Sequence, residues 1–197
     1  MYRVPGKFDQ AECNGRGRKP IVVISGPPGS GKTTYSKRLA QDLNLPYHSA
    51  GQIFREIASS KGLRLDEMSR LAEKDPSIDL LIDETTMKRA TRCGGVIEGH
   101  LTAWVLKDIA DVSIFLNAPL DVRLGRISGR EKNDVIEETI SREESQYHRY
   151  LKFYGIDVNI YSGFDMVIDT SKASIEEVYR TIRVFVESVL KRKGWKV

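Results

Sequence analysis

The sequence predicts a single α/β domain in which a parallel sheet is flanked by helices. Short runs of β-branched and aliphatic residues recur along the chain, amphipathic stretches separate them, and a glycine-rich segment follows the first run. Strands that alternate with helices indicate a parallel sheet. The 197 residues suffice for one compact domain, and we find no internal repeat that divides them.

The first predicted strand is Ile-Val-Val-Ile at 21–24, which no polar residue interrupts, as expected for a strand covered on both faces. Similar runs predict strands at 95–98, 112–116 and 166–168, and a short one at 45–48. Apolar spacing predicts intervening helices at 33–43, 52–60, 65–74 and 135–150. The last helix should begin after Ser174, which forms a capping-box pattern with Glu177.

The domain organisation follows from polarity along the chain. Residues 1–18 are polar and lack periodicity, so we expect a flexible leader before a single domain at 19–197. Two stretches within that domain, 52–92 and 123–150, are too hydrophilic to lie beneath the sheet. We therefore predict that both are mobile segments inserted into a rigid core.

Composition narrows the classes of function. The formal net charge of +4 suits an acidic ligand, and nucleotides and nucleic acids both qualify. No apolar run reaches the roughly 20 residues of a membrane span, and the N-terminal segment lacks the apolar centre of a secretory signal. We expect a cytoplasmic monomer without a membrane partner. The three histidines are far apart in sequence, which gives a zinc site little support.

The strongest motif is the glycine-rich segment after the first strand. Residues 26–33 read G-P-P-G-S-G-K-T, the full phosphate-binding pattern known as a P-loop. Glycines let successive N–H groups point at phosphate oxygens, and the following helix adds its positive dipole end. Lys32 should reach the β- and γ-phosphates of ATP, and the Thr33 hydroxyl should hold Mg²⁺. The predicted nucleotide-binding residues are Gly26, Pro27, Pro28, Gly29, Ser30, Gly31, Lys32, Thr33 and Thr34.

Arginines favour a kinase among the P-loop proteins. A guanine-specific GTPase would need an [NT]-K-x-D segment after a strand, and the similar string at 131–134 has the wrong first residue and no preceding strand. Phosphoryl transfer is catalysed mainly by electrostatic clamping, for which the planar guanidinium is suited. We predict this role, with Lys32, for Arg126, Arg130, Arg142 and Arg149. A solvated helix face is the alternative, and we prefer it for Arg123.

Several strings together resemble the nucleoside monophosphate kinases, and more closely the short archaeal-type cytidylate kinases. They are the P-loop, S-A-G-Q-I-F-R at 49–55, V-I-E-G-H at 96–100, L-A-E-K-D-P-S-I-D at 71–79, S-R-E-E-S-Q at 141–146, Y-G-I-D at 154–157 and V-I-D-T-S at 167–171. The resemblance covers about residues 20–180. It implies a P-loop kinase fold in which 49–92 is the insert that binds the monophosphate and 123–150 is the lid.

The resemblance also implies roles for individual residues. Ser49, Gly51 and Arg55 match the element beneath the acceptor nucleotide, in which the arginine grips the monophosphate. Glu98 matches the acidic residue that organises Mg²⁺, although an Asp is common there. Gly99 follows it and is also assigned to the acceptor.

In the lid, the resemblance assigns Arg126 to stacking on the donor adenine and Arg130 to its phosphates. Arg142 and Arg149 match lid arginines that bridge donor and acceptor.

Two positions depart from the family pattern. His100 stands where many cytidylate kinases have an arginine that binds the acceptor phosphate, and it is either a weaker donor to that phosphate or an ordinary partly buried histidine. Leu101 stands where the bacterial enzymes have an Asp that reads the pyrimidine edge. Recognition of cytosine must therefore come from elsewhere, and the polar insert at 60–92 is one candidate.

The expected reaction is direct transfer of the γ-phosphoryl group of Mg-ATP to CMP or dCMP, giving CDP or dCDP. Two alternatives stay open. One is a kinase for another small acceptor, such as adenylate, UMP or shikimate. The other is a nucleotide-dependent regulator that binds nucleic acid through the basic segment at 191–196, although basic residues are also expected at a helix C-terminus.

Overall fold

The computed structural model describes residues 19–128 and 134–197. The predicted leader, residues 1–18, lies outside the described part, as does Arg130. Five parallel strands form one sheet in the order β2-β3-β1-β4-β5. The strands are β1 (Ile21–Ser25), β2 (Tyr47–Ser49), β3 (Gly95–Gly99), β4 (Val112–Asn117) and β5 (Met166–Asp169). All five predicted strands are confirmed, with ends shifted by one or two residues.

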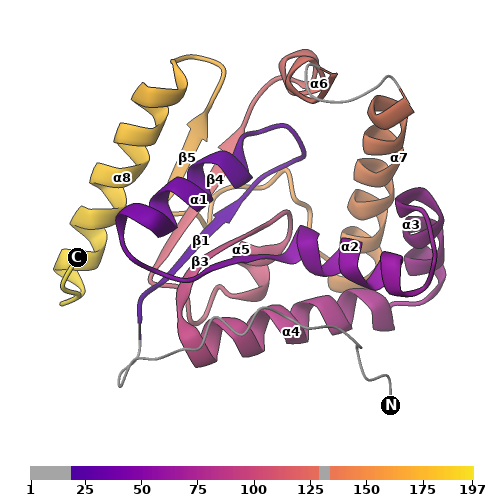
Figure 1. Ribbon diagram of the computed structural model, residues 1–197, viewed down its shortest axis with the longest axis horizontal. Helices are drawn as coiled ribbons and strands as arrows, with labels where there is room; N and C mark the ends of the chain where they lie inside the picture. The colour runs from indigo at the N-terminus through magenta and orange to yellow at the C-terminus, as the bar shows by residue number, and fades with distance from the viewer. Residues whose placement is uncertain (1–18, 129–133) are drawn as a thin grey trace.

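Helices cover both faces of the sheet (Figure 1). They are α1 (Lys32–Asp42), α2 (Ala50–Ser60), α3 (Leu65–Lys74), α4 (Ser77–Cys93), α5 (Thr102–Val105), α6 (Leu120–Ser128), α7 (Asp134–Arg149) and α8 (Ile175–Arg192). A π-helical turn, η1 (Tyr150–Tyr154), continues α7. None of the helices in the described ranges is both long and apolar enough to span a bilayer.

The side chains of β1 divide the core into two layers, because successive residues of a strand point to opposite faces. Val22 and Ile24 pack with residues of α1 and α8, whereas Ile21 and Val23 pack with residues of α4 and α5. These four strand residues are at most 3% exposed. The continuous apolar run of the sequence therefore reflects burial on both sides.

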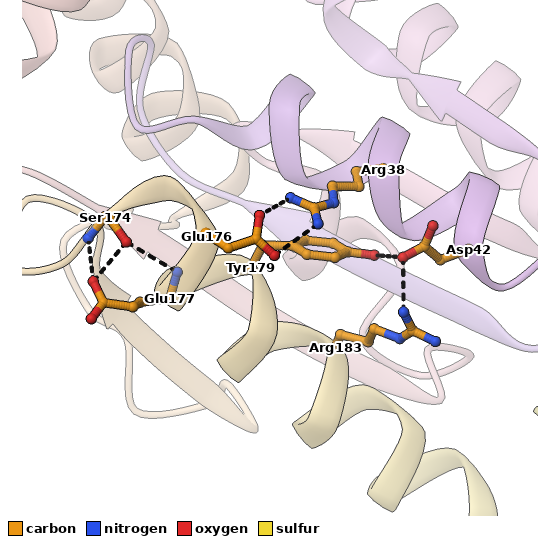
Figure 2. Close-up of polar contacts among 7 residues, drawn as sticks. All are labelled: Arg38, Asp42, Ser174, Glu176, Glu177, Tyr179 and Arg183. Carbon is orange, nitrogen blue, oxygen red and sulfur yellow. Dashed lines mark hydrogen bonds and ion pairs between the residues drawn. The ribbon is translucent and has the colours of Figure 1, made fainter.

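The predicted capping box of α8 is present. Ser174 Oγ accepts a hydrogen bond from the Glu177 N–H, and the Glu177 carboxylate accepts one from the Ser174 N–H at 2.9 Å. Figure 2 shows this cap beside a cluster of polar side chains between α1 and α8. The cap sets the residue at which α8 begins, and the helix then packs its apolar face against the sheet.

The segment at 49–92 has a hydrophobic cluster of its own. Residues of α2, α3 and α4 pack together there: Ile53, Phe54, Ile57, Ala58, Met68, Ala72, Ile78 and Ile82. Helix α3 also packs against α7, and the two lie side by side in Figure 1. The segment is thus a packed helical layer beside the sheet. It contacts the second hydrophilic stretch, which contains α7.

Candidate active site

A cavity of about 580 Å³ lies at the C-terminal edge of the sheet, the edge at which ligands of open α/β folds bind. Its wall combines the loop after β1, the first turns of α1 and α2, the end of β3, and parts of α4, α6 and α7. Most of the predicted site residues line it: Pro28, Gly29, Gly31, Lys32, Thr33, Thr34, Ser49, Gly51, Arg55, Glu98, Gly99, His100, Arg126, Arg142 and Arg149. Gly26, Pro27 and Ser30 belong to the same loop but do not line this cavity.

The loop between β1 and α1 depends on glycine at several points. Gly26 has φ 148°, and an added Cβ would lie 2.2 Å from the Leu116 carbonyl oxygen. Gly31 has φ 96° and is the N-cap of α1, so no side chain satisfies the first amides of this helix. Free N–H groups at a helix N-terminus, together with the helix dipole, form an anion-binding site.

Lys32 lies at this helix start, with its ammonium directed back over the loop. Its Nζ donates a hydrogen bond to the Pro27 carbonyl oxygen at 2.9 Å. Burial lowers the pKa of Lys32 to about 8, because desolvation disfavours the charged form, although the Glu98 carboxylate opposes the shift. A phosphate bound here would supply the negative charge that a buried ammonium needs.

Glu98, near the end of β3, accepts hydrogen bonds from three hydroxyl groups. Its Oε1 accepts hydrogen bonds from Ser49 at 2.7 Å, Tyr47 at 2.9 Å and Thr33 at 3.2 Å. The parallel register explains two of these contacts, because Ser49 pairs with Glu98 and Tyr47 lies two residues earlier on the same face of β2. Tyr47 was not among the predicted site residues, because its approach to Glu98 depends on β2 lying beside β3.

Thr33 and Glu98 are the predicted metal ligands, and they contribute a hydroxyl and a carboxylate oxygen to one point of the cavity. In the described ranges, no group of three or more His, Cys, Asp or Glu side chains could hold a metal ion. Such a sparse, all-oxygen set suits Mg²⁺, which is usually held by one or two protein oxygens, water and substrate phosphates.

Arg55 projects from α2 into the cavity. Its Nη1 lies 3.4 Å from the position that a Cβ on Gly51 would take, so the guanidinium folds back over the first turn of α2. Within residues 19–128 and 134–197, Arg55 makes no hydrogen bond or ion pair. This side chain is therefore a cation available to a ligand.

His100 follows β3 and is neutral in this environment. Burial lowers its pKa to about 4, and the nearby Lys32 ammonium adds to the shift. Its Nδ1 lies 3.1 Å from Gln146 Oε1, and its ring meets Tyr150 edge-on with centroids 5.6 Å apart. The preceding Gly99 leaves room for Thr102, whose Oγ1 would lie 2.1 Å from an added Cβ. His100 is thus a partly buried, hydrogen-bonded residue in the cavity wall.

The predicted arginines occupy different positions. Arg126 donates hydrogen bonds to the Gly29 carbonyl oxygen at 3.2 Å and to the backbone and hydroxyl oxygens of Thr170. Arg142 lines the cavity, and its charge acts on Lys32. Arg149 is 1% exposed and donates to Asp79 at 2.7 and 3.3 Å and to Ser145 at 2.7 Å.

Arg123 corrects the sequence analysis, which preferred a solvated helix face for it. The residue is 7% exposed, and its guanidinium donates to the carbonyl oxygens of Ala118 and Pro28. It also forms an ion pair with Glu143 of α7, with hydrogen bonds of 2.7 and 3.0 Å. Arg123 therefore ties the phosphate loop to α7. Local spacing gave no signal, because Glu143 lies 20 residues away.

The fold and the cavity together define a small kinase of the P-loop class. Solved structures with this fold include an uncharacterised protein from Eubacterium ventriosum, with a TM-score of 0.63 and 19% identity over 86% of this chain and 99% of that chain. They also include shikimate kinase from Bacteroides thetaiotaomicron, with a TM-score of 0.60 and 15% identity over 85% and 98% of the two chains. At these identities the likeness concerns the fold alone.

Sequence comparison identifies the family. The sequence model of the cytidylate kinase-like family matches residues 21–172. A cytidylate kinase from Staphylothermus marinus is 49% identical over 87% of this chain and 98% of its own length. One from Aeropyrum pernix is 52% identical over 81% of this chain and 95% of its own. The chain belongs to the cytidylate kinase-like family.

Proposed function

We propose that this chain transfers the γ-phosphoryl group of ATP to the phosphate of CMP or dCMP. The observation that carries the proposal is that one cavity unites the phosphate loop and Lys32 with the acceptor candidates Ser49 and Arg55. The activity named for its curated relatives agrees with this arrangement.

For the donor, the loop amides and Lys32 would hold the β- and γ-phosphates of ATP. Thr33 and Glu98 would hold Mg²⁺, whose chemistry when bound is to neutralise charge that develops on the phosphoryl oxygens. Glu98 is kept in one orientation by three hydroxyl donors, so it needs no rearrangement to serve. Arg126, fixed between the loop and Thr170, would flank the donor nucleotide.

For the acceptor, Ser49, Gly51 and Gly99 would border the monophosphate, and Arg55 would grip it bidentately. His100 is neutral and would offer a hydrogen bond in place of a charge. The acceptor oxygen is already anionic near neutral pH, so the reaction requires no dedicated general base. Arg142 would stabilise the migrating group.

Two further residues complete the predicted clamp. Arg130 remains a prediction outside the described residues. Arg149 would bridge the two nucleotides only by leaving its ion pair with Asp79.

We also propose that 49–92 acts as the monophosphate-binding insert and 123–150 as the lid, and that the enzyme works as a cytoplasmic monomer. Closure of both segments on the nucleotides would exclude water and so limit ATP hydrolysis. The contact between α3 and α7 supports a common closing movement.

The proposal is tested by measuring ADP production from Mg-ATP with CMP, dCMP, UMP, AMP and GMP supplied separately. We expect strong stimulation by CMP or dCMP. ATP turnover that no monophosphate stimulates would contradict the proposal. Preference for a different acceptor, including shikimate, would identify one of the other small-molecule kinases.

A further inference from the structure

The cavity changes its electrostatic character from one end to the other. Lys32 interacts with the charges of Glu98, Glu143, Arg142 and Arg123, which mark the phosphate end. At the α4 end, the cavity is lined by the carboxylates Asp79 and Asp83, one helical turn apart on the same face. Arg149 pairs with Asp79, so the uncompensated charge at this end is that of Asp83, which would repel a phosphate. An acceptor nucleotide would therefore place its phosphate near Lys32 and its base near α4.

The two α4 carboxylates differ in how far their oxygens are occupied. Asp79 is 5% exposed and accepts hydrogen bonds from Arg149 on both oxygens. Asp83 accepts one from the Tyr154 hydroxyl on Oδ2 at 2.5 Å, and its Oδ1 takes part in no hydrogen bond or ion pair within the described part of the chain. Both oxygens of Asp79 are therefore used within the protein, whereas Oδ1 of Asp83 can still accept a hydrogen bond from a ligand.

Tyr154 owes its position to the π-helical turn that continues α7. Such a turn re-aims side chains relative to a regular helix, and it recurs at functional sites. Here η1 brings Tyr154 onto Asp83 and places Tyr150 in the cavity wall. Because the Tyr154 hydroxyl occupies Oδ2, Oδ1 is the oxygen of Asp83 that remains available to a ligand.

The surroundings of Asp83 suit a flat ring. Phe54, Leu65 and Ile82 line the cavity with apolar surface, and Tyr150 adds an aromatic ring. Ligand sites of this kind use apolar walls for contact area and a few polar groups for specificity. The exocyclic amino group of cytosine donates hydrogen bonds, whereas uracil has a carbonyl oxygen at the same ring position.

We propose that Asp83 selects the base of the acceptor: its Oδ1 accepts a hydrogen bond from the cytosine amino group and repels the corresponding oxygen of uracil. This inference rests on the proposed function and names a specificity residue for the same site. A carboxylate that faces a carbonyl oxygen sets acceptor against acceptor, so it gives specificity by repulsion as well as by attraction. Adenine carries an amino group in the equivalent arrangement, so Asp83 separates amino from keto bases and does not by itself separate CMP from AMP.

The pH dependence of selectivity follows from the same group. Burial raises the pKa of Asp83 to about 6, with the Asp79 charge adding to the shift and the Tyr154 hydrogen bond opposing it. Other groups at this end are Arg149, which is paired with Asp79, Tyr150, whose pKa is raised by burial, and Arg142 of α7, whose charge acts on Tyr150. Below pH 6 the protonated carboxyl can donate to uracil as well, so discrimination between CMP and UMP is present above that pH and lost below it.

The substitution Asp83→Asn tests the proposal. An asparagine can keep the Tyr154 contact through its carbonyl oxygen and present an amino group to the base, which reverses the polarity of the free position. With saturating Mg-ATP, we expect the ratio of kcat/KM for CMP over UMP to fall about 10- to 100-fold, mostly through a gain with UMP. The ratio of CMP to AMP should change little, because both bases carry the amino group.

Glu84→Gln is the matched control, since Glu84 is the next residue of α4, is exposed, and pairs with Lys88 on the surface. An Asp83→Asn enzyme with the wild-type CMP-to-UMP ratio would overturn the inference. So would a wild-type ratio that stays constant between pH 5 and about 7.5, a measurement that needs no variant to fold. The acceptor phosphates titrate alike in CMP and UMP, so they cancel in the ratio. A wild-type enzyme inactive on CMP would instead contradict the proposed function.

Discussion

Two polar clusters of this molecule differ in how completely their charges are used. Between α1 and α8, Arg38 forms two hydrogen bonds with Glu176 and lies 3.8 Å over the Tyr179 ring, while Asp42 accepts from both Tyr179 and Arg183 (Figure 2). In the cavity, Arg55 has no partner in the described ranges and Lys32 has a lowered pKa. Satisfied surface charges support the fold, whereas buried or unpaired ones indicate a site that awaits a ligand.

The largest expected effect is a loss of activity on replacing Lys32, which belongs to the cavity and not to the α1–α8 cluster. Lys32→Ala should reduce kcat about 10²- to 10³-fold with CMP as acceptor, because it removes the preorganised ammonium that would stabilise charge on the migrating phosphoryl group. The melting temperature of the variant should stay near that of the wild type, since a buried ammonium adds little stability of its own. Near-normal phosphoryl transfer by Lys32→Ala would exclude the assigned role of the loop.

A smaller effect should appear in the pH dependence. The pKa of Lys32 is lowered to about 8 in the free enzyme, so the ammonium is present below that pH and lost above it. We expect kcat/KM for Mg-ATP to fall about tenfold per pH unit above 8, because this parameter reports the free enzyme. His100, with a pKa near 4, stays neutral and should add no change between pH 6 and 9.

The same measurement on Lys32→Arg provides the control, because a guanidinium keeps its charge throughout this range. Its residual kcat/KM should be flat above pH 8. An equal decline in both enzymes would assign the titration to another group.

The smallest effect is expected on the α1–α8 surface. Arg38→Ala removes two hydrogen bonds to Glu176, which is exposed to solvent, and the contact with the buried ring of Tyr179. We expect kcat/KM for CMP within about twofold of the wild type and a slightly lower melting temperature, as for most exposed ion pairs. A large loss of activity would mean that α1 transmits changes on its outer face to the phosphate loop.

The sequence predicted the strands well because each is a short apolar run buried on both faces, and β1 is the clearest example. It predicted the phosphate loop because the motif is local and its glycines permit the backbone conformation that the loop requires. The order of strands is not written in any local pattern. The meeting of Ser49 and Tyr47 with Glu98 was therefore beyond reach, since it requires β2 to lie beside β3.

Long-range pairing also explains the other misses. Arg123 looked like a surface residue, because its partner Glu143 belongs to another helix. Asp79 and Asp83 were not among the predicted site residues, because their partners Arg149 and Tyr154 lie about 70 residues away. A charge in a hydrophilic stretch can be buried against a second hydrophilic stretch, and composition alone does not distinguish the two situations.

In the closure proposed above, the packing of α3 against α7 would link the binding of the two nucleotides thermodynamically. A movement of α7 that opens the cavity must carry α3 with it or break that contact. The free energy of such a closure would be shared by the ligands that hold the two helices, and the first to bind would lower the cost for the second. Coupling of this kind is reciprocal: the factor by which ATP raises the affinity for CMP must equal the factor by which CMP raises the affinity for ATP.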